Sequence, residues 1–163
     1  VQAEKEVQVK INKLMAIRGT RSVDSIHTER GHIMWDFVGM ARTDASLKTA
    51  IEKITALEKV FWSDLRIPGE ADSLNIELEK ALRLWDFIET GKLMAYDALN
   101  REESCGGHFR EEYQTPEGEA LRRDDEFSYV ACWKYEGEGK KPELLKEPLN
   151  YEYIKVQTRN YKS

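Results

Sequence analysis

Residues 101–110 hold the side chains whose types and spacing are best suited to chemistry in this sequence. Two adjacent glycines, which can approach another surface closely or take positive φ angles, stand among side chains able to form charge-assisted hydrogen bonds. We expect a structural joint that docks one domain on another, since buried ion networks often have purely structural roles. The residues assigned to this domain-docking motif are Arg101, Glu103, Ser104, Gly106, Gly107, His108 and Arg110.

The same segment could also be an ordinary helix C-terminus. A helix that ends near Arg101 would then be followed by a glycine cap, with basic side chains facing the negative end of the helix dipole. Under either interpretation the segment is structural, and we expect no catalytic residue in it.

Metal binding and nucleophilic catalysis fit this sequence poorly. Cys105 and His108 form a C-x-x-H pair, but tetrahedral zinc needs about two further nitrogen or sulfur ligands. The remaining cysteine and histidines have no paired spacing. Ser104 does not stand in a nucleophile-elbow pattern. We therefore expect no metal site in this chain.

The composition favours a helical domain that binds neither nucleic acid nor the membrane interior. Of the 163 residues, 40% are hydrophobic and 34% charged, which suits amphipathic helices with one solvated face. The net charge of −5 argues against a nucleic-acid-binding surface. No apolar stretch is long enough to cross a bilayer, so direct membrane insertion is not expected. The two cysteines are typical of reduced thiols, although a single disulfide is also compatible with the sequence.

The first two amphipathic segments cover residues 1–17 and 22–40. We expect Gly19 to end the first as a C-terminal cap, and Gly31 or Gly39 to weaken the second. The first segment begins inside a periodic pattern without a capping residue, which predicts a piece of a longer protein. The expected apolar stripes are Val7, Ile11, Leu14 and Ile17, followed by Ile26, Ile33, Met34, Phe37 and Val38.

Two further helices complete the predicted bundle. Thr43 or Asp44 caps the third, which runs to about residue 61, and residues 62–73 form a loop. Ser73 or Asn75 opens the fourth, which is long or bent and continues to about residue 99. The stripes are Leu47, Ile51, Ile54, Leu57 and Phe61 in the third helix and Leu78, Leu82, Trp85 and Ile88 in the fourth.

An irregular arm is expected to follow the helices. Residues 127–135 are aromatic and β-rich, and we expect residues 151–156 to be their antiparallel partner. A lone hairpin is marginally stable in water, so it should lie against the helices or another domain. The predicted fold is mainly α: an antiparallel bundle of three to four helices over residues 1–103, then a glycine joint and an arm with a small β-hairpin over residues 104–163.

Three stretches of the sequence resemble the C-terminal domain of the succinate dehydrogenase and fumarate reductase flavoproteins. Residues 34–43, MWDFVGMART, are similar to the family's M-W-x-x-V-G-x-x-R turn between helices. Residues 98–112, ALNREESCGGHFREE, resemble the R-x-E-S-R-G-x-H-x-R-x-D signature that closes the last helix. This stretch departs from the signature at Cys105, where many relatives carry arginine, so no salt bridge is inferred there. Residues 123–126, RDDE, resemble the stretch before the family's terminal hairpin.

The resemblance implies an FAD-dependent oxidoreductase that acts on succinate or fumarate, of which this chain is one domain. FAD, the catalytic residues and the flavin contacts are expected upstream, in agreement with the missing G-x-G-x-x-G turn. The isolated chain should therefore bind no cofactor and be inactive. We expect three partners: the flavin domain of the same polypeptide, an iron–sulfur subunit and a membrane quinone-reactive subunit. The resemblance implies a cytoplasmic location, peripheral on the inner face of the cell membrane.

Two other functions are compatible with the sequence. L-aspartate oxidases share the helical domain and the arginine version of the signature, so the chain could be the C-terminal domain of such an enzyme. It could also be a stand-alone helical interaction module without chemistry. The upstream reading frame discriminates between these classes, because a dinucleotide-binding fingerprint there would indicate the flavoenzyme.

Overall fold

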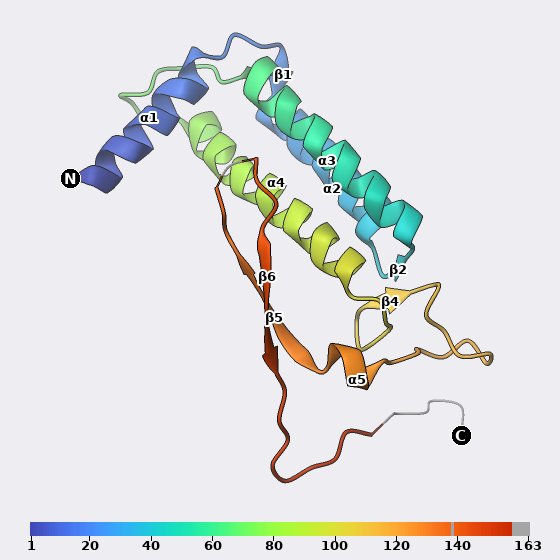
Figure 1. The fold of residues 1–163 in the computed structure, drawn as a ribbon. Coiled ribbons are helices and arrows are strands. Elements are labelled where there is room, and N and C mark those ends of the chain that lie inside the picture. Colours follow the sequence, from blue (N-terminus) through green and yellow to red (C-terminus); the bar gives the residue numbers. More distant parts are fainter. Residues whose placement is uncertain (138, 158–163) are drawn as a thin grey trace.

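Three long helices lie side by side in the computed structural model, which describes residues 1–137 and 139–157. They are α2 (Val23–Val38), α3 (Asp44–Asp64) and α4 (Ile76–Asn100), and consecutive helices run antiparallel (Figure 1). A further helix, α1 (Gln2–Ala16), precedes them, and an arm with a β-hairpin follows. The predicted mainly α fold, a helical bundle with a small C-terminal hairpin, is confirmed.

Hydrogen-bonding side chains define where the bundle helices begin. The Ser22 hydroxyl accepts a hydrogen bond from the Ser25 amide at the start of α2. Thr43 and Ser46 form a reciprocal capping box at the start of α3, and the Asn75 carboxamide accepts from an amide in the first turn of α4. These contacts satisfy amide groups that have no partner within a helix. Of the alternatives left open by the sequence, Thr43 and Asn75 are the caps.

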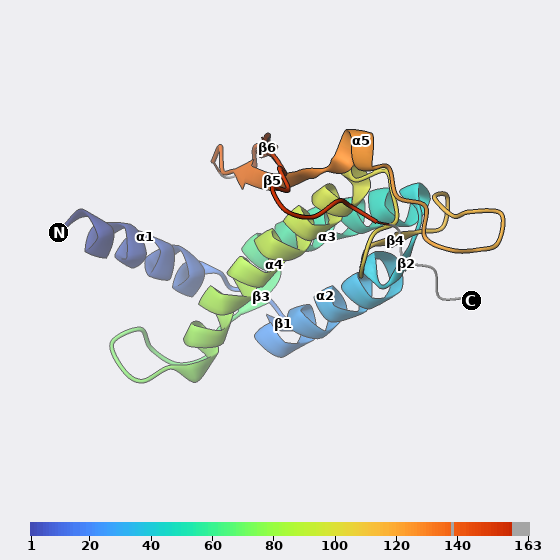
Figure 2. The same ribbon diagram turned by 90° about the horizontal axis from the view of Figure 1, so that it is seen from below.

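Apolar side chains of α2, α3 and α4 form most of the core. The fully or nearly fully buried residues include Ile26, Ile33, Leu47, Ile54, Leu57, Phe61, Leu84 and Ile88. In α1, by contrast, only Leu14 is buried, and Val7 is 54% exposed. The expectation of a continuous buried stripe on this helix is wrong for its first half, because α1 projects beyond the bundle (Figure 2).

Two pairs of short parallel strands lie at the ends of the bundle, and each strand is two residues long. β1 (Arg21–Ser22) pairs with β3 (Leu65–Arg66), and β2 (Ala41–Arg42) pairs with β4 (Phe109–Arg110). The second pair brings the candidate segment, which follows α4, against the connection between α2 and α3. Sequence reasoning missed these short pairs, which have no periodic signal of their own.

Several glycine predictions need correction. Gly19 does not cap α1, because the C-terminal cap of this helix is Ile17 in an extended conformation. Instead, the Gly19 amide donates to the carbonyl of Leu65, the first residue of β3. Gly31 lies inside an unbroken α2, and this helix ends just before Gly39. The prediction of a long fourth helix is confirmed, because α4 continues without interruption through Gly91. Tertiary packing thus outweighs the weak helix propensity of glycine at these two positions.

The hairpin pairs a different segment from the one predicted. β5 (Tyr129–Lys134), which follows the one-turn helix α5 (Asp124–Phe127), pairs antiparallel with β6 (Glu143–Pro148) and not with residues 151–156. Cross-strand contacts explain this choice: Lys134 forms an ion pair with Glu143, and the Lys146 amine lies 4.4 Å from the Tyr129 ring centroid. The β6 sequence is charged and ends in proline, so it lacks the alternating apolar pattern from which a strand is predicted.

The hairpin lies against α4, as the sequence predicted. The Trp133 indole nitrogen donates a hydrogen bond of 2.7 Å to the Asp97 carboxylate of α4. Figures 1 and 2 show the hairpin across α4 from α2. In the part of the chain that the structure describes, no helix is long and apolar enough to pass through a membrane.

Candidate functional site

The candidate segment leaves α4 and turns back on itself at its two glycines. Cys105 and His108 exchange backbone hydrogen bonds of 2.8 and 3.1 Å, which places Gly106 and Gly107 at the tip of the turn. Gly106 has a φ of +59°, the left-handed conformation that glycine adopts without strain, whereas Gly107 has no positive φ. Both glycines are exposed, so the turn presents bare backbone at the surface.

Arg110 caps the end of α4 from inside the protein. Its side chain is almost fully buried, and its guanidinium donates to the carbonyls of Ala98 and Leu99 at 3.0 and 3.2 Å. These carbonyls belong to the last turn of α4, where no intrahelical amide is available to them. The expectation of a basic side chain at the helix end is therefore confirmed, but the glycine cap is wrong, because α4 ends with Arg101 in an extended conformation.

The Ser104 side chain holds the backbone of Arg110 in place. The fully buried Ser104 hydroxyl accepts a hydrogen bond from the Arg110 amide at 2.8 Å and donates to the Arg110 carbonyl at 3.1 Å. The Ser104 amide also donates to the Leu121 carbonyl. Because its hydroxyl is committed in both directions, Ser104 is a structural residue rather than a nucleophile.

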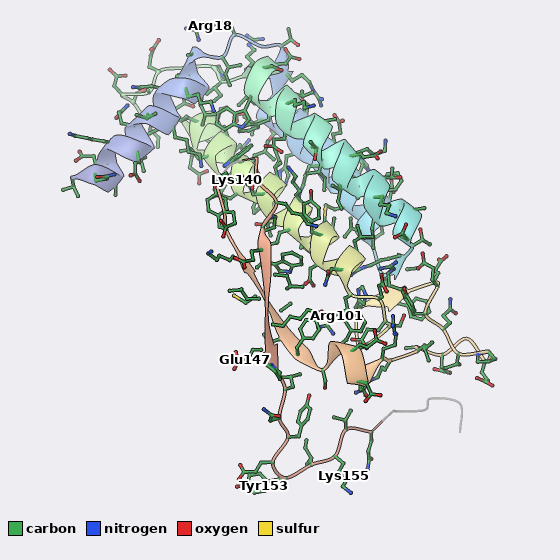
Figure 3. The ribbon with its side chains drawn as sticks, in the orientation of Figure 1. Arg18, Arg101, Lys140, Glu147, Tyr153 and Lys155 are labelled. Atoms are coloured by element: carbon green, nitrogen blue, oxygen red, sulfur yellow. The ribbon has the colours of Figure 1, made fainter. Side chains whose placement is uncertain are left out.

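Arg101 and Glu103 connect the segment to the arm. The buried Glu103 carboxylate accepts from the Arg101 guanidinium at 2.6 Å and from the Arg123 amide at 2.9 Å. The Arg101 guanidinium also donates to the carbonyls of Phe127 and Tyr129 (Figure 3, where Arg101 lies between α4 and β5). The ion pair therefore holds the start of the hairpin against the end of α4.

His108 is held in one neutral tautomer. The Arg42 guanidinium lies 2.9 Å from Nδ1 of His108, and since arginine only donates, Nδ1 must accept. Nε2 then carries the proton and donates to the Arg101 carbonyl at 2.9 Å. Burial, together with the positive charges of Arg42, Arg110 and Arg101, lowers the pKa of His108 below its ordinary value, against the opposing effect of the Arg101 carbonyl.

This lowered pKa predicts that the protein loses stability when it is mildly acidified. The unfolded chain binds the proton near pH 6.5, but folded His108 binds it only at lower pH, so protonation favours unfolding. We expect the free energy of unfolding to be constant above about pH 6.5, to fall between that pH and the folded pKa, and to level off below it. Urea unfolding followed by circular dichroism at several pH values measures this dependence.

Two comparisons isolate the contribution of His108. His108→Gln should remove the loss of stability in this pH range, whereas His32→Gln, at an exposed position on α2, should retain it. Burial raises the pKa of Glu112, but hydrogen bonds from the Asp44 amide and Arg110 outweigh this and lower it below 4.5, so its effect falls in a more acidic range. An unchanged pH dependence in His108→Gln would contradict the assignment.

The structure brings the predicted motif together but adds residues that the sequence did not single out. Arg42 comes from β2, and its guanidinium joins His108 to the Gly39 carbonyl. Arg123 contributes its amide to Glu103, and Glu112 bridges Arg110 and the first amide of α3. The available signal for Arg42 was its place as the arginine of the M-W-x-x-V-G-x-x-R pattern, which sequence reasoning did not carry into the site.

Taken as chemistry, the site is an ion network around a surface turn. Among the described residues, no group of three or more histidine, cysteine, aspartate or glutamate side chains could hold a metal ion. Cys105 is half-buried and Cys132 exposed, and both are free thiols. The buried charges of Glu103 and Arg110 and the half-buried charge of Arg101 all have partners within the site, which connects α4, the arm and the α2–α3 connection.

Comparison with known proteins relates the chain to a group of flavoproteins. A family model described as "Fumarate reductase flavoprotein C-term" matches residues 27–161. One of the subunits of the fumarate reductase (CoM/CoB) from Methanothermobacter marburgensis is 35% identical over 98 residues, covering 60% of this chain and 17% of that protein. An uncharacterized FAD-dependent oxidoreductase from Methanocaldococcus jannaschii is 28% identical over 113 residues, covering 69% of this chain and 20% of that protein.

Solved structures share the fold. A quinol-fumarate reductase with menaquinol molecules has a TM-score of 0.79 at 23% identity, over 93% of this chain and 25% of that one. Mycobacterium smegmatis Sdh1 in complex with UQ1 has a TM-score of 0.76 at 18% identity, over 94% and 25%. The chain thus spans about a fifth of the length of the curated relatives it matches and a quarter of these solved chains.

Proposed function

The chain belongs to the family of fumarate reductase flavoprotein C-terminal domains, and from this premise we propose that it is one domain of an FAD-dependent succinate dehydrogenase or fumarate reductase flavoprotein subunit. The observation that carries the proposal is the family match over residues 27–161. Since the chain spans about a fifth of its curated relatives, the substrate site and the flavin are assigned to the rest of the polypeptide. The whole subunit would interconvert succinate and fumarate, with hydride passing between succinate and the flavin.

The residues of this chain do not fit an FAD pyrophosphate. Dinucleotide sites use a glycine-rich turn between a strand and the N-terminus of a helix. β1 leads directly into α2, and β2 reaches α3 through Thr43 alone. The longer connections from β3 to α4 and from β4 to α5 contain one glycine each, Gly69 and Gly118, so none of the four is a glycine-rich turn. FAD would therefore be bound by the remaining polypeptide, and the isolated domain is expected to be colourless and inactive.

The domain-docking motif would hold the helical domain on the flavin domain. The turn at Gly106 and Gly107 is exposed, and β2–β4 pairing places it at the same end of the bundle as the last turn of α2. Trp35 and Met40, at that end, are 83% and 78% exposed. Exposed apolar side chains beside a bare glycine turn are typical of a surface that another protein part covers. Residues 1–103 would form the packed body and 104–163 the arm.

The proposal also places the subunit in a larger electron-transfer complex. Similar proteins include the flavoprotein subunit of an 8-methylmenaquinol:fumarate reductase from Wolinella succinogenes. By this relationship, an iron–sulfur subunit and a membrane quinone-reactive subunit would accept or supply the electrons. The flavoprotein would then lie on the inner face of the cell membrane as a peripheral part of the complex.

Purification of the complete gene product that contains this sequence tests the proposal. We expect a yellow protein with a flavin absorption spectrum that reduces a dye with succinate or oxidises a reduced dye with fumarate. Oxidation of L-aspartate without activity on succinate or fumarate would instead indicate an L-aspartate oxidase. A colourless product without any of these activities would contradict the flavoenzyme assignment and favour a stand-alone interaction module.

Gly107→Val tests the docking role of the turn. A side chain at Gly107 meets no other atom within 4 Å in this chain, and the φ angle there is not positive. We therefore expect unchanged unfolding of the isolated domain, but lower flavin occupancy in the complete subunit, because the side chain would collide with the docked domain. Flavin-to-protein absorbance ratios of the two complete proteins measure the effect.

Gly106→Val provides the contrast. Its φ of +59° is strained for a β-branched residue, so this change should lower the stability of the isolated domain as well. Full flavin occupancy in Gly107→Val would rule out close contact at the turn.

A further inference from the structure

One outer face of the bundle has at its centre an arginine for which the described part of the chain provides no charged partner. The face is formed by neighbouring turns of α2 and α4, which pack against each other (Figure 2). We call it the α2–α4 face, and its residues are His27, Arg30, Met34, Phe87, Gly91 and Met94. Spacings of three and four residues place each set on one side of its helix.

Arg30 is packed tightly into this face. A Cβ added to Gly91 would lie 3.0 Å from a terminal guanidinium nitrogen of Arg30 and 3.1 Å from the Met34 sulfur. The guanidinium carbon lies 5.9 Å from the centroid of the Phe87 ring, which also stacks on His27. The arginine side chain therefore fills the notch that the missing side chain of Gly91 leaves on α4.

The charge of Arg30 is not neutralised within the described part of the chain. Its Nε atom is buried without a hydrogen-bond partner, and no carboxylate in residues 1–137 and 139–157 forms an ion pair with its guanidinium. Other half-buried arginines are different: Arg101, Arg122 and Arg123 each have a carboxylate partner. Burial lowers the pKa of Arg30, as expected for a charge that is partly removed from water.

The surroundings of Arg30 are apolar and open to the outside. Phe87 is 40% exposed and Met94 is 49% exposed. A separate hollow of about 250 Å³ on the other side of His27 and Phe87 is lined in part by the charged residues Asp24, Lys80 and Arg83 and does not include Arg30. The hairpin does not cover this face, because it lies across α4 from α2 (Figures 1 and 2). A half-buried guanidinium surrounded by these apolar side chains is complementary to a carboxylate that is itself flanked by apolar side chains.

We infer that the α2–α4 face is a docking surface for an aspartate or glutamate of the flavin-binding part of the same polypeptide, with Arg30 as its ion-pair partner. The inference rests on the proposed function, in which this domain is about a quarter of a longer chain. The remaining three quarters of that chain are joined covalently to the domain and so are always available to cover the face. The contact would be separate from the glycine turn, which lies beyond the end of α4.

A cross-linking experiment on the complete subunit identifies the partner directly. Arg30→Lys keeps the positive charge and introduces an amine that a carbodiimide joins to a carboxylate within ion-pair distance. We expect one dominant cross-link from position 30 to an aspartate or glutamate of the flavin-binding part, found by peptide mass spectrometry. A cross-link to a second copy or to a separate subunit would overturn the inference, and so would the absence of any cross-link.

A second variant separates docking from a role inside the domain. Arg30→Met keeps the bulk of the side chain but removes an unpaired charge, so the isolated domain should be unchanged or more stable. In the complete subunit, the same change leaves the partner carboxylate without a counter-ion. Proteolysis between this domain and the flavin-binding part should then become at least about tenfold faster. Lys48→Met, which removes an exposed cation of α3 that is paired with Asp44 and lies outside this face, should change neither property.

Failure of this inference and failure of the proposed function give different results in these experiments. A yellow, active wild-type subunit whose Arg30→Met variant is not cleaved faster would overturn the docking surface and leave the proposed function intact. A colourless, inactive wild-type product would overturn the proposed function, and with it the identity of the partner. Equal destabilisation of the isolated domain and the complete subunit by Arg30→Met would also overturn the inference, because Arg30 would then act within the bundle.

Discussion

Replacing Arg110 with methionine is expected to lower the free energy of unfolding by about 3–5 kcal/mol, since hydrogen bonds from charged groups contribute about 1.5–3 kcal/mol each. Methionine fills much of the space but cannot donate. The carbonyls of Ala98 and Leu99 would then remain without the partner that ends α4, and Glu112 would lose its buried counter-ion. Urea unfolding monitored by tryptophan fluorescence and circular dichroism measures the change.

Two further variants define the cause of this loss. Arg110→Lys retains the charge but has a single donor nitrogen, whereas Arg110 donates to the α4 carbonyls through Nη1 and to Glu112 through Nε. The stability of Arg110→Lys should therefore lie between wild type and Arg110→Met. Arg122→Met removes an arginine whose partner, Asp124, has a side chain that is 40% exposed, and should cost less than about 1 kcal/mol. Equal losses in Arg110→Met and Arg122→Met would show that the bonds to α4 contribute little.

Gly19→Ala is expected to be the most damaging single-methyl change in the chain, with a loss of about 3 kcal/mol or more. A Cβ at this position would lie 1.9 Å from the carbonyl carbon of Asp64, and this neighbour is backbone that cannot rotate away. The change would separate the Gly19 amide from the Leu65 carbonyl and displace the β1–β3 pair. Thermal unfolding and near-ultraviolet circular dichroism would report the shift.

Gly31→Ala is the matched control for this prediction. Gly31 lies within α2, and a Cβ there meets no atom within 4 Å. Alanine should therefore stabilise the protein by about 0.5–1 kcal/mol through its higher helix propensity. The same substitution thus has opposite signs at two glycines, and a stabilising effect of Gly19→Ala would contradict the close backbone approach.

The bundle helices could be predicted from sequence because their signals are local. Apolar residues at spacings of three and four mark the stripes of α2, α3 and α4, and Thr43 and Asn75 mark where helices begin. The stripe of α1 is equally periodic, yet Val7 is exposed. Periodicity shows which side of a helix could be buried, whereas the presence of a neighbour decides whether it is buried.

The hairpin and the site depended on contacts between distant parts of the chain. Residues 151–156 alternate better than β6, but β6 is selected by pairs such as Lys134 with Glu143. In the site, Arg42 reaches His108 only because β2 pairs with β4. A contact across more than sixty positions has no signature in the spacing of either segment.

The sequence by itself determined the helical class of this protein, the approximate starts of its bundle helices and the resemblance to one flavoprotein family through short motifs. Tertiary structure alone decided what the singled-out residues do: Arg110 bonds the last carbonyls of α4, Gly19 admits a neighbouring backbone, and Arg30 finds no ion-pair partner among the residues that the structure describes. The physical reason is that helix propensity and amphipathic spacing are properties of adjacent residues. Desolvation, ion pairing and close approach, by contrast, exist only between segments that folding has brought together.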